Sequence, residues 1–235
     1  MRYRSVGLLV LLSKILLGQV LTTEATAPGG ILTIALASDH SVSETVRSAM
    51  QREAENAMAP SGVVLRWKDS NSLNSELFQR LAKVRLRGVC RVGAPIPSSL
   101  RMDRRNMEAL GETQVVDGLV LPIADLQCDS VRKLIDRDLR VAPASGQDEL
   151  LGRALGRVMA HELYHVLLRT RVHGRSGLAR PAQNSAELLA PRNTFAGEEE
   201  RKLAQSEAVG DASTNASTNA STNASTNASS NADGR

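Results

Sequence analysis

One long helix constrains the fold of this chain more than any other feature. From Asp148 to Thr170 no proline interrupts the sequence, and apolar side chains recur at spacings of three and four residues. At 1.5 Å per residue the stretch is about 30 Å long, enough to cross a small domain. Acidic residues at its start and Arg169 and Arg171 at its end favour the two ends of a helix. The apolar stripe consists of Leu151, Leu155, Val158, Met159, Leu163 and Val166.

The same stretch contains the run His161-Glu162-Leu163-Tyr164-His165. Residues four apart share one face of a helix, so the two imidazoles can bind one zinc ion. Glu162 is turned about 100° from His161, where a carboxylate can accept a proton from water at the metal. Tyr164 projects away from both histidines and is assigned to packing. The pattern is typical of zinc-dependent peptidases; the alternative is a pair of surface histidines on an ordinary amphipathic helix.

A catalytic zinc site needs three protein ligands and one open position. The chain has four histidines, so His40 and His173 remain beside the pair on the helix. His173 precedes Gly174 and Gly177, in a run where the chain can turn back over the metal. We therefore predict His173 as the third ligand. Two alternatives stay open: His173 is an exposed loop residue, or Glu187 on a second helix supplies the third ligand.

These residues resemble the metzincin clan of zinc peptidases, particularly its matrixin-like and archaemetzincin-like secreted bacterial members. The resemblance is carried by His161-Glu162-x-x-His165 followed by His173-Gly174 and Gly177-Leu178, within about residues 158–190. The metzincin pattern is HExxHxxGxxH with a downstream methionine turn. This chain has Leu168 in place of the glycine, its third histidine two residues later, and Ala179 near the expected methionine. The resemblance implies a zinc peptidase with a three-histidine site.

The segment 28–195 is long enough for one domain with a single core. The apolar runs Ile31–Ala37 and Val63–Trp67 predict two strands, and Ser41-x-x-Glu44 is a capping box that opens a helix reaching about Met58. Val115 to Ile123, interrupted by Asp117-Gly118, predicts a further strand or a hairpin. A short helix is expected over Asp129–Leu139, before the long one.

Lys83, Arg85 and Arg87 alternate with Val84, Leu86 and Val89, which predicts a strand with one basic and one apolar face. A solvated face is the simpler interpretation. The alternative is an edge strand along which an extended peptide binds. The order of the elements resembles the metzincin upper domain. We therefore expect an α+β fold: a single zincin-like domain with a mixed twisted sheet and a long active-site helix.

Residues 1–27 have the features of a secretory signal peptide. Arg2 and Arg4 precede the apolar run Val6–Leu17, and Ala25-Thr26-Ala27 offers a small-x-small cleavage site. The segment is too short for a comfortable membrane span, although an uncleaved anchor is an alternative. We expect a secreted or extracytoplasmic protein without a stable membrane span.

Cys90 and Cys128 are the only cysteines, and an oxidising compartment makes one disulfide the natural interpretation of such a pair. The alternative is two unpaired buried thiols. The formal charge of the whole chain is +4, and three of its basic residues lie in the expected signal peptide. This weak basicity does not imply a nucleic acid partner. The expected partner is a peptide or protein substrate, and the sequence does not define an oligomeric state.

The chain ends in a low-complexity region. From Ala212 to Ser229 it repeats Ala-Ser-Thr-Asn, without a large apolar side chain to bury. We predict a disordered tail over residues 196–235.

Three functions compete at this point. The first is a zinc endopeptidase with Glu162 as general base. The second is a catalytically inactive, zinc-stabilised secreted binding domain. The third is an exported structural or surface protein in which the histidine motif occurs by chance.

Overall fold

The computed structural model describes residues 29–73, 77–97 and 109–206. The expected signal peptide and the Ala-Ser-Thr-Asn repeats lie outside these residues. The described elements are, in chain order, β1 (Ile31–Ser38), α1 (Glu44–Met58), the 3₁₀ turn η1 (Ala59–Ser61), β2 (Val64–Asp69), the 3₁₀ turn η2 (Ser70–Ser72), β3 (Leu81–Arg87), β4 (Gly111–Val116), β5 (Leu119–Gln127), α2 (Cys128–Leu134), α3 (Asp136–Val141), α4 (Ala144–Leu168), α5 (Ser185–Leu189) and α6 (Gly197–Ala204).

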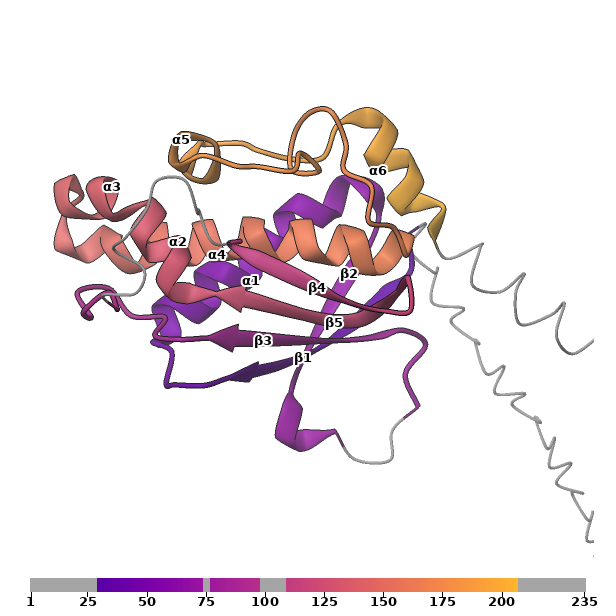
Figure 1. The fold of residues 1–235 in the computed structure, drawn as a ribbon, viewed down its shortest axis with the longest axis horizontal. Helices are drawn as coiled ribbons and strands as arrows, with labels where there is room; N and C mark the ends of the chain where they lie inside the picture. The colour runs from indigo at the N-terminus through magenta and orange to yellow at the C-terminus, as the bar shows by residue number, and fades with distance from the viewer. Residues whose placement is uncertain (1–28, 74–76, 98–108, 207–235) are drawn as a thin grey trace, which may run out of the picture.

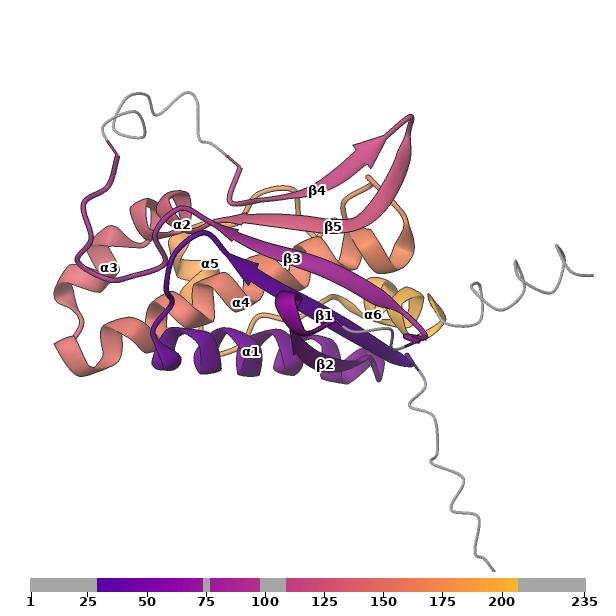
Figure 2. The ribbon, with the colours of Figure 1, turned by 90° about the horizontal axis from the view of Figure 1, so that it is seen from below.

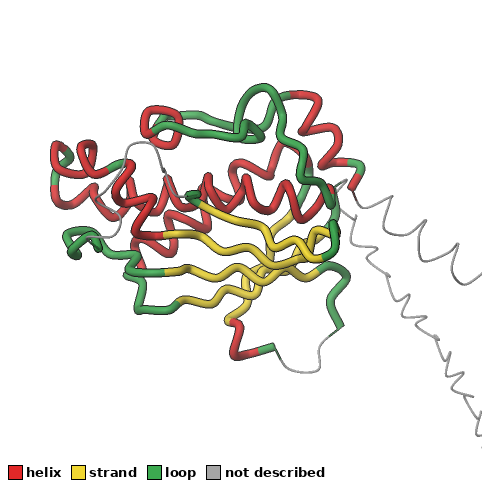
Figure 3. Tube along the Cα trace, viewed as in Figure 1, coloured by secondary structure: helices red, strands yellow, loops and turns green. Residues whose placement is uncertain are grey.

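The fold is α+β and contains a mixed five-stranded sheet, as expected. The strand order is β2-β1-β3-β5-β4; β4 runs antiparallel to β5, and the other neighbours are parallel. The helices α1 and α4 lie together over one face of the sheet, and α5 and α6 lie beyond α4 (Figures 1 and 3). The opposite face, here called the open face, carries no long helix among the described residues.

The central strands have the burial that their sequences predict. β1 is buried from Leu32 to Leu36, as is usual for a parallel strand with neighbours on both sides. In β3, Val84 and Leu86 are buried while Lys83 and Arg87 are exposed, which confirms one apolar and one basic face. The interpretation of β3 as an edge strand is wrong, because it lies between β1 and β5. The edges are β2 and β4.

The predicted hairpin is formed by β4 and β5. Asp117 and Gly118 both have positive φ, 51° and 80°, in the two-residue turn between the strands. Thr113 pairs with Ala124 but Val115 pairs with Val120, so β5 has extra residues opposite Gln114. Pro122 lies within that insertion and has no N–H to offer a neighbouring strand, which suits a bulge. Beyond it the hairpin curves away from the other strands (Figure 2).

Two glycines allow α4 to pack closely on α1. A Cβ atom on Gly152 would lie 2.6 Å from the carbonyl oxygen of Val46, and one on Gly156 would lie 2.5 Å from that of Met50. Any side chain at these positions would push the helices apart. The predicted apolar stripe of α4 is buried against α1 and the sheet, with only Val166 partly exposed.

Arg157 links α4 to two other segments while it is almost fully buried. Its Nε donates to Glu53 Oε1 of α1 at 2.6 Å, and its two Nη atoms donate to the carbonyl oxygens of Glu187 and Ala190 at 2.8 and 2.7 Å. A buried charge needs such a full set of partners. This side chain therefore fixes the segment around α5 over α4.

Three helix boundaries differ from the prediction. The cap of α1 is Ser43 rather than Ser41, because the Val46 N–H donates to Ser43 Oγ at 3.2 Å. The helix expected over Asp129–Leu139 is two short helices, α2 and α3, that meet at Ile135. The long helix starts at Ala144, directly after Pro143, four residues before Asp148.

The domain also extends past residue 195, where the tail was predicted to begin. Residues 197–204 form α6, whose Leu203 is fully buried and whose Glu199 is nearly so. One buried leucine among charged residues gives little periodic signal, which is why the sequence did not reveal this helix. The prediction of disorder from residue 196 is therefore wrong for this helix.

A disulfide joins Cys90, after β3, to Cys128 at the start of α2, with 4.9 Å between their Cα atoms. Both residues are buried. No helix in the described ranges is long and apolar enough to cross a membrane.

Candidate metal centre

Three histidines form one cluster at the end of α4. His161 and His165 lie on the last two turns of the helix, and His173 comes from the loop that follows. One ligand atom from each lies within 4.8 Å of the others. The distances between ring centroids are 4.7 to 5.2 Å. The predicted ligand set is therefore brought together, while His40 lies elsewhere, exposed beyond β1.

Backbone carbonyl groups fix the tautomers of the two helical histidines. His161 Nδ1 lies 2.6 Å from the Leu178 oxygen, and His165 Nδ1 lies 2.8 Å from the Thr170 oxygen. A carbonyl oxygen only accepts, so each Nδ1 carries the proton and each Nε2 keeps a lone pair. Metal-binding histidines are usually oriented in this way.

The Nε2 atoms of the two helical histidines lie close together. The two Nε2 atoms are 3.1 Å apart. Two nitrogens bound to a tetrahedral zinc ion at 2.0–2.1 Å would be about 3.3 Å apart. The spacing of these donors therefore fits zinc.

The histidines are held in the uncharged form that a metal requires. Burial lowers the pKa of His161, partly opposed by its hydrogen bond to Leu178. Burial, together with the neighbouring His161, lowers the pKa of His165 to about 4. Burial also lowers the pKa of His173. Neutral imidazoles bind metal without first losing a proton at neutral pH.

The loop after α4 turns back as its glycines predict. Gly177 has φ of 61° and lies so close to the Thr194 carbonyl oxygen that a side chain would collide with it. The Leu178 N–H donates to that oxygen at 3.1 Å, and the Gly174 N–H donates to Ala179 at 2.8 Å. These bonds place the Leu178 carbonyl beside His161.

An aromatic pair supports the cluster from one side. Tyr164 lies edge-on to His165, with ring centroids 5.2 Å apart, and stacks on Phe195 at 5.6 Å. The Tyr164 hydroxyl donates to the Val172 carbonyl at 3.3 Å, which agrees with a packing role. Ala179, near the position of the expected methionine, is fully buried and contacts Gly174. Phe195 was missed because nothing in the local sequence links it to the motif.

Glu162 lies beneath the edge strand β4. It is only 5% exposed, and its Oε2 accepts a hydrogen bond from the Thr113 hydroxyl at 2.7 Å. Burial raises the pKa of Glu162 to about 7; the Thr113 hydrogen bonds oppose this, and the charge of Glu112 adds to it. The carboxylate is thus close to the histidines in sequence and buried against β4. Sequence patterns missed Thr113, which is far away along the chain.

Glu187, the alternative third ligand, has other partners. It lies on α5, where its backbone N–H and side chain complete a capping box with Asn184, and it pairs with Arg180. The group that could hold a metal ion, within the described residues, comprises His161, His165 and His173. The geometry therefore favours His173 over Glu187.

No family model matches the chain, and neither curated proteins nor solved structures show a significant match to it.

Proposed function

We propose that this protein is a zinc-dependent peptidase of the metzincin type. The observation that carries the proposal is the pair of unprotonated Nε2 atoms 3.1 Å apart, with His173 beside them and the carboxylate of Glu162 next in sequence. Three neutral imidazoles and one buried carboxylate are the groups that metal-assisted hydrolysis needs.

His161, His165 and His173 would hold the zinc ion. When bound, zinc supplies a Lewis acid that polarises the scissile carbonyl and makes water more acidic. Three protein ligands leave one position for substrate or water, as in other catalytic zinc sites. His173 is the exposed member of the three, so the cluster is open to solvent on its side.

Glu162 is the general base in this proposal. Its carboxylate accepts a proton as the oxygen of water attacks the peptide carbonyl carbon. It then gives that proton to the amide nitrogen as the carbon–nitrogen bond breaks, so no proton is gained or lost overall. Its burial beneath β4 keeps bulk water from competing for this proton.

The strand β4 offers a binding edge for the substrate. Among the described residues it pairs only with β5, and its residue Thr113 contacts Glu162. An extended peptide paired with the other edge of β4 would therefore pass the base. The basic strand β3 cannot take this role, because both of its edges are paired.

The architecture supports the same proposal. A mixed sheet with one antiparallel edge strand, and a long helix that carries both histidines, agrees with the expected zincin-like fold. The Cys90–Cys128 disulfide agrees with the proposed export of the chain to an oxidising compartment.

Chelation and reconstitution test the function. The purified protein is treated with a zinc chelator, dialysed, and divided into samples with and without added zinc; cleavage of an unfolded protein substrate is followed by mass spectrometry. We expect cleavage only in the sample with zinc. A zinc-loaded protein that cleaves nothing would indicate the binding domain instead, and cleavage that survives chelation would contradict the mechanism.

A further inference from the structure

We propose that the edge strand β4 positions the base Glu162, with Thr113 as the positioning residue and Gly111 providing the space for the carboxylate. This role rests on the proposed peptidase function, and it adds two residues that are far from the histidine motif in sequence. Both residues lie on the side of β4 that faces α4, because residues two apart in a strand share a face.

Thr113 fixes one oxygen of the carboxylate. Its hydroxyl lies 2.7 Å from Glu162 Oε2 and 3.2 Å from the carbonyl oxygen of the same residue. The hydroxyl has one proton, and the shorter contact to a charged acceptor is the stronger hydrogen bond. Oε2 is thereby held in place, while Oε1 lies toward Gly111.

Gly111 contacts the other side of the same group. A Cβ atom at this position would lie 2.7 Å from Glu162 Oε1, 2.8 Å from its Cγ and 2.9 Å from Val158 Cγ1. These distances are too short for real contacts, so any side chain would displace the carboxylate or the strand. The absence of a side chain at 111 and the hydroxyl at 113 together restrict Glu162 to one orientation.

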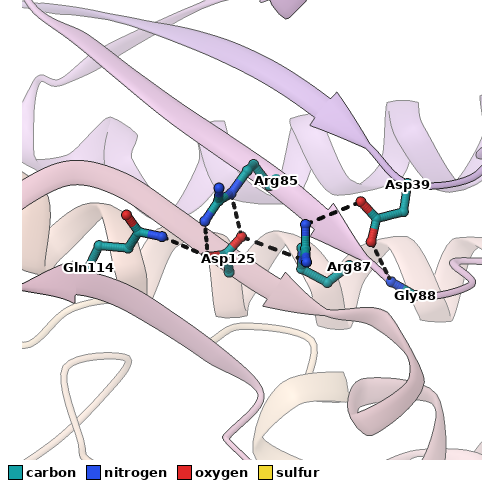
Figure 4. Close-up of polar contacts among 6 residues, drawn as sticks. All are labelled: Asp39, Arg85, Arg87, Gly88, Gln114 and Asp125. Atoms are coloured by element: carbon teal, nitrogen blue, oxygen red, sulfur yellow. Dashed lines mark hydrogen bonds and ion pairs between the residues drawn. The ribbon is translucent and has the colours of Figure 1, made fainter.

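A hydrogen bond on the open face of the sheet also holds β4 in position. Gln114, the residue after Thr113, points to the open face, where its Nε2 donates to Asp125 Oδ2 at 3.3 Å (Figure 4). Adjacent residues of a strand point to opposite faces. β4 therefore connects the sheet to Glu162. A base that is held in one orientation is already correctly placed for proton transfer.

Substitutions at position 113 test this role. Thr113→Val removes the hydroxyl at nearly constant shape, and Thr113→Ser restores it; Thr33→Val, on the central strand β1, controls for the same change elsewhere in the sheet. We expect Thr113→Val to keep its zinc and a KM within about twofold, while kcat falls at least about tenfold. Thr113→Ser and Thr33→Val should stay within about threefold of the wild-type kcat.

A side chain added at position 111 tests the same role with a second variant. Gly111→Ala should also lower kcat more than it changes KM, with zinc content unchanged, because it displaces the carboxylate rather than a ligand. Normal kcat in both Thr113→Val and Gly111→Ala would overturn the proposal. So would a Thr113→Ser protein as slow as Thr113→Val.

Thermal unfolding of the metal-free protein tests the contact without any activity. Thr113→Val should lower the melting temperature in the wild-type background but have much less effect in Glu162→Ala, because the shared hydrogen bond is already lost. Equal shifts in the two backgrounds would contradict the contact. A wild type that is no more active than Glu162→Gln would overturn both the peptidase function and this role. An active wild type with normal kcat in Thr113→Val and Gly111→Ala would overturn this role alone.

Discussion

One polar cluster lies on the open face of the sheet and another at the end of α4, and the two differ in whether their polar atoms have partners within the protein. On the open face, Asp125 accepts from Arg85 Nε at 2.6 Å and from Gln114, and it lies 4.0 Å from Arg87 (Figure 4). On the helix side, two imidazole nitrogens with lone pairs face each other at 3.1 Å. The groups of the first cluster satisfy one another, and those of the second could hold a metal ion.

The open-face cluster extends over three parallel strands. Arg87 donates to Asp39 Oδ1 at 3.4 Å, and the Gly88 N–H donates to Asp39 Oδ2 at 3.3 Å. The hydrogen bond and the charge of Asp125 raise the pKa of Arg85. Each carboxylate thus meets donors from neighbouring strands, which is how ion pairs align a sheet.

This difference separates structural from functional polar groups. Buried or half-buried charges that satisfy one another hold elements in register. Acceptors that converge without a donor are instead suited to bind a metal ion. We expect substitutions on the open face to change stability and those on the helix side to change metal binding or catalysis.

The largest effect is expected for Glu162→Gln. An amide cannot accept the proton from water, so hydrolysis should fall by about 10²–10⁴-fold while zinc content stays the same. The Thr113 hydroxyl can still donate to the amide oxygen, so folding should be little changed. Peptide cleavage and metal analysis of the same samples measure both quantities. Near-normal cleavage by this variant would show that the base is wrongly assigned.

Replacement of His173 comes next. His173→Ala removes one of three imidazoles, and we expect zinc affinity to fall by at least about tenfold in a chelator competition titration. Glu187→Ala is the matched control: it should leave zinc affinity unchanged and destabilise the protein by about 1 kcal/mol, because it breaks the capping box of α5. Zinc that is kept without His173 and lost without Glu187 would reverse the assignment.

Asp125→Ala tests the open face. The change leaves Arg85 without its main partner, although that side chain is partly exposed and can be hydrated. We expect a loss of about 1–2 kcal/mol in the free energy of unfolding, measured with urea, and an unchanged zinc content. If the variant lost zinc but kept its stability, the proposed division between the two faces would be wrong.

The smallest effect is expected at the end of the chain. Deleting everything after Gly210 removes repeats without large apolar side chains, so the melting temperature and metal content should not change. Leu203→Ala, within α6, is the contrasting variant and should cost about 2–5 kcal/mol, because that leucine is fully buried. A large drop in melting temperature after the deletion would contradict this view of the tail.

Local patterns predicted the parts of the fold that depend on local chemistry. The apolar stripe predicted α4 with both of its histidines, alternation predicted the two faces of β3, and the glycines predicted the turn after His173. These signals need only the period of a helix or a strand, or the freedom of a glycine.

Other features depend on contacts between distant residues. Alternation cannot tell a central strand from an edge strand, which is why β3 was open to the edge interpretation. Thr113 and Glu162 are 49 residues apart in sequence, and no local period links them. Likewise, α6 packs on the domain through the fully buried Leu203. Because most of its other residues are charged, its own sequence does not reveal this contact.

The proposed function depends above all on zinc binding by the three imidazoles. The most direct measurement is the zinc bound per chain after dialysis, for the wild type and for a variant that combines His161→Ala with His165→Ala. We predict one zinc ion per wild-type chain and none in the variant. A wild type that retains no zinc, or a variant that retains as much as the wild type, would contradict the assignment of this site.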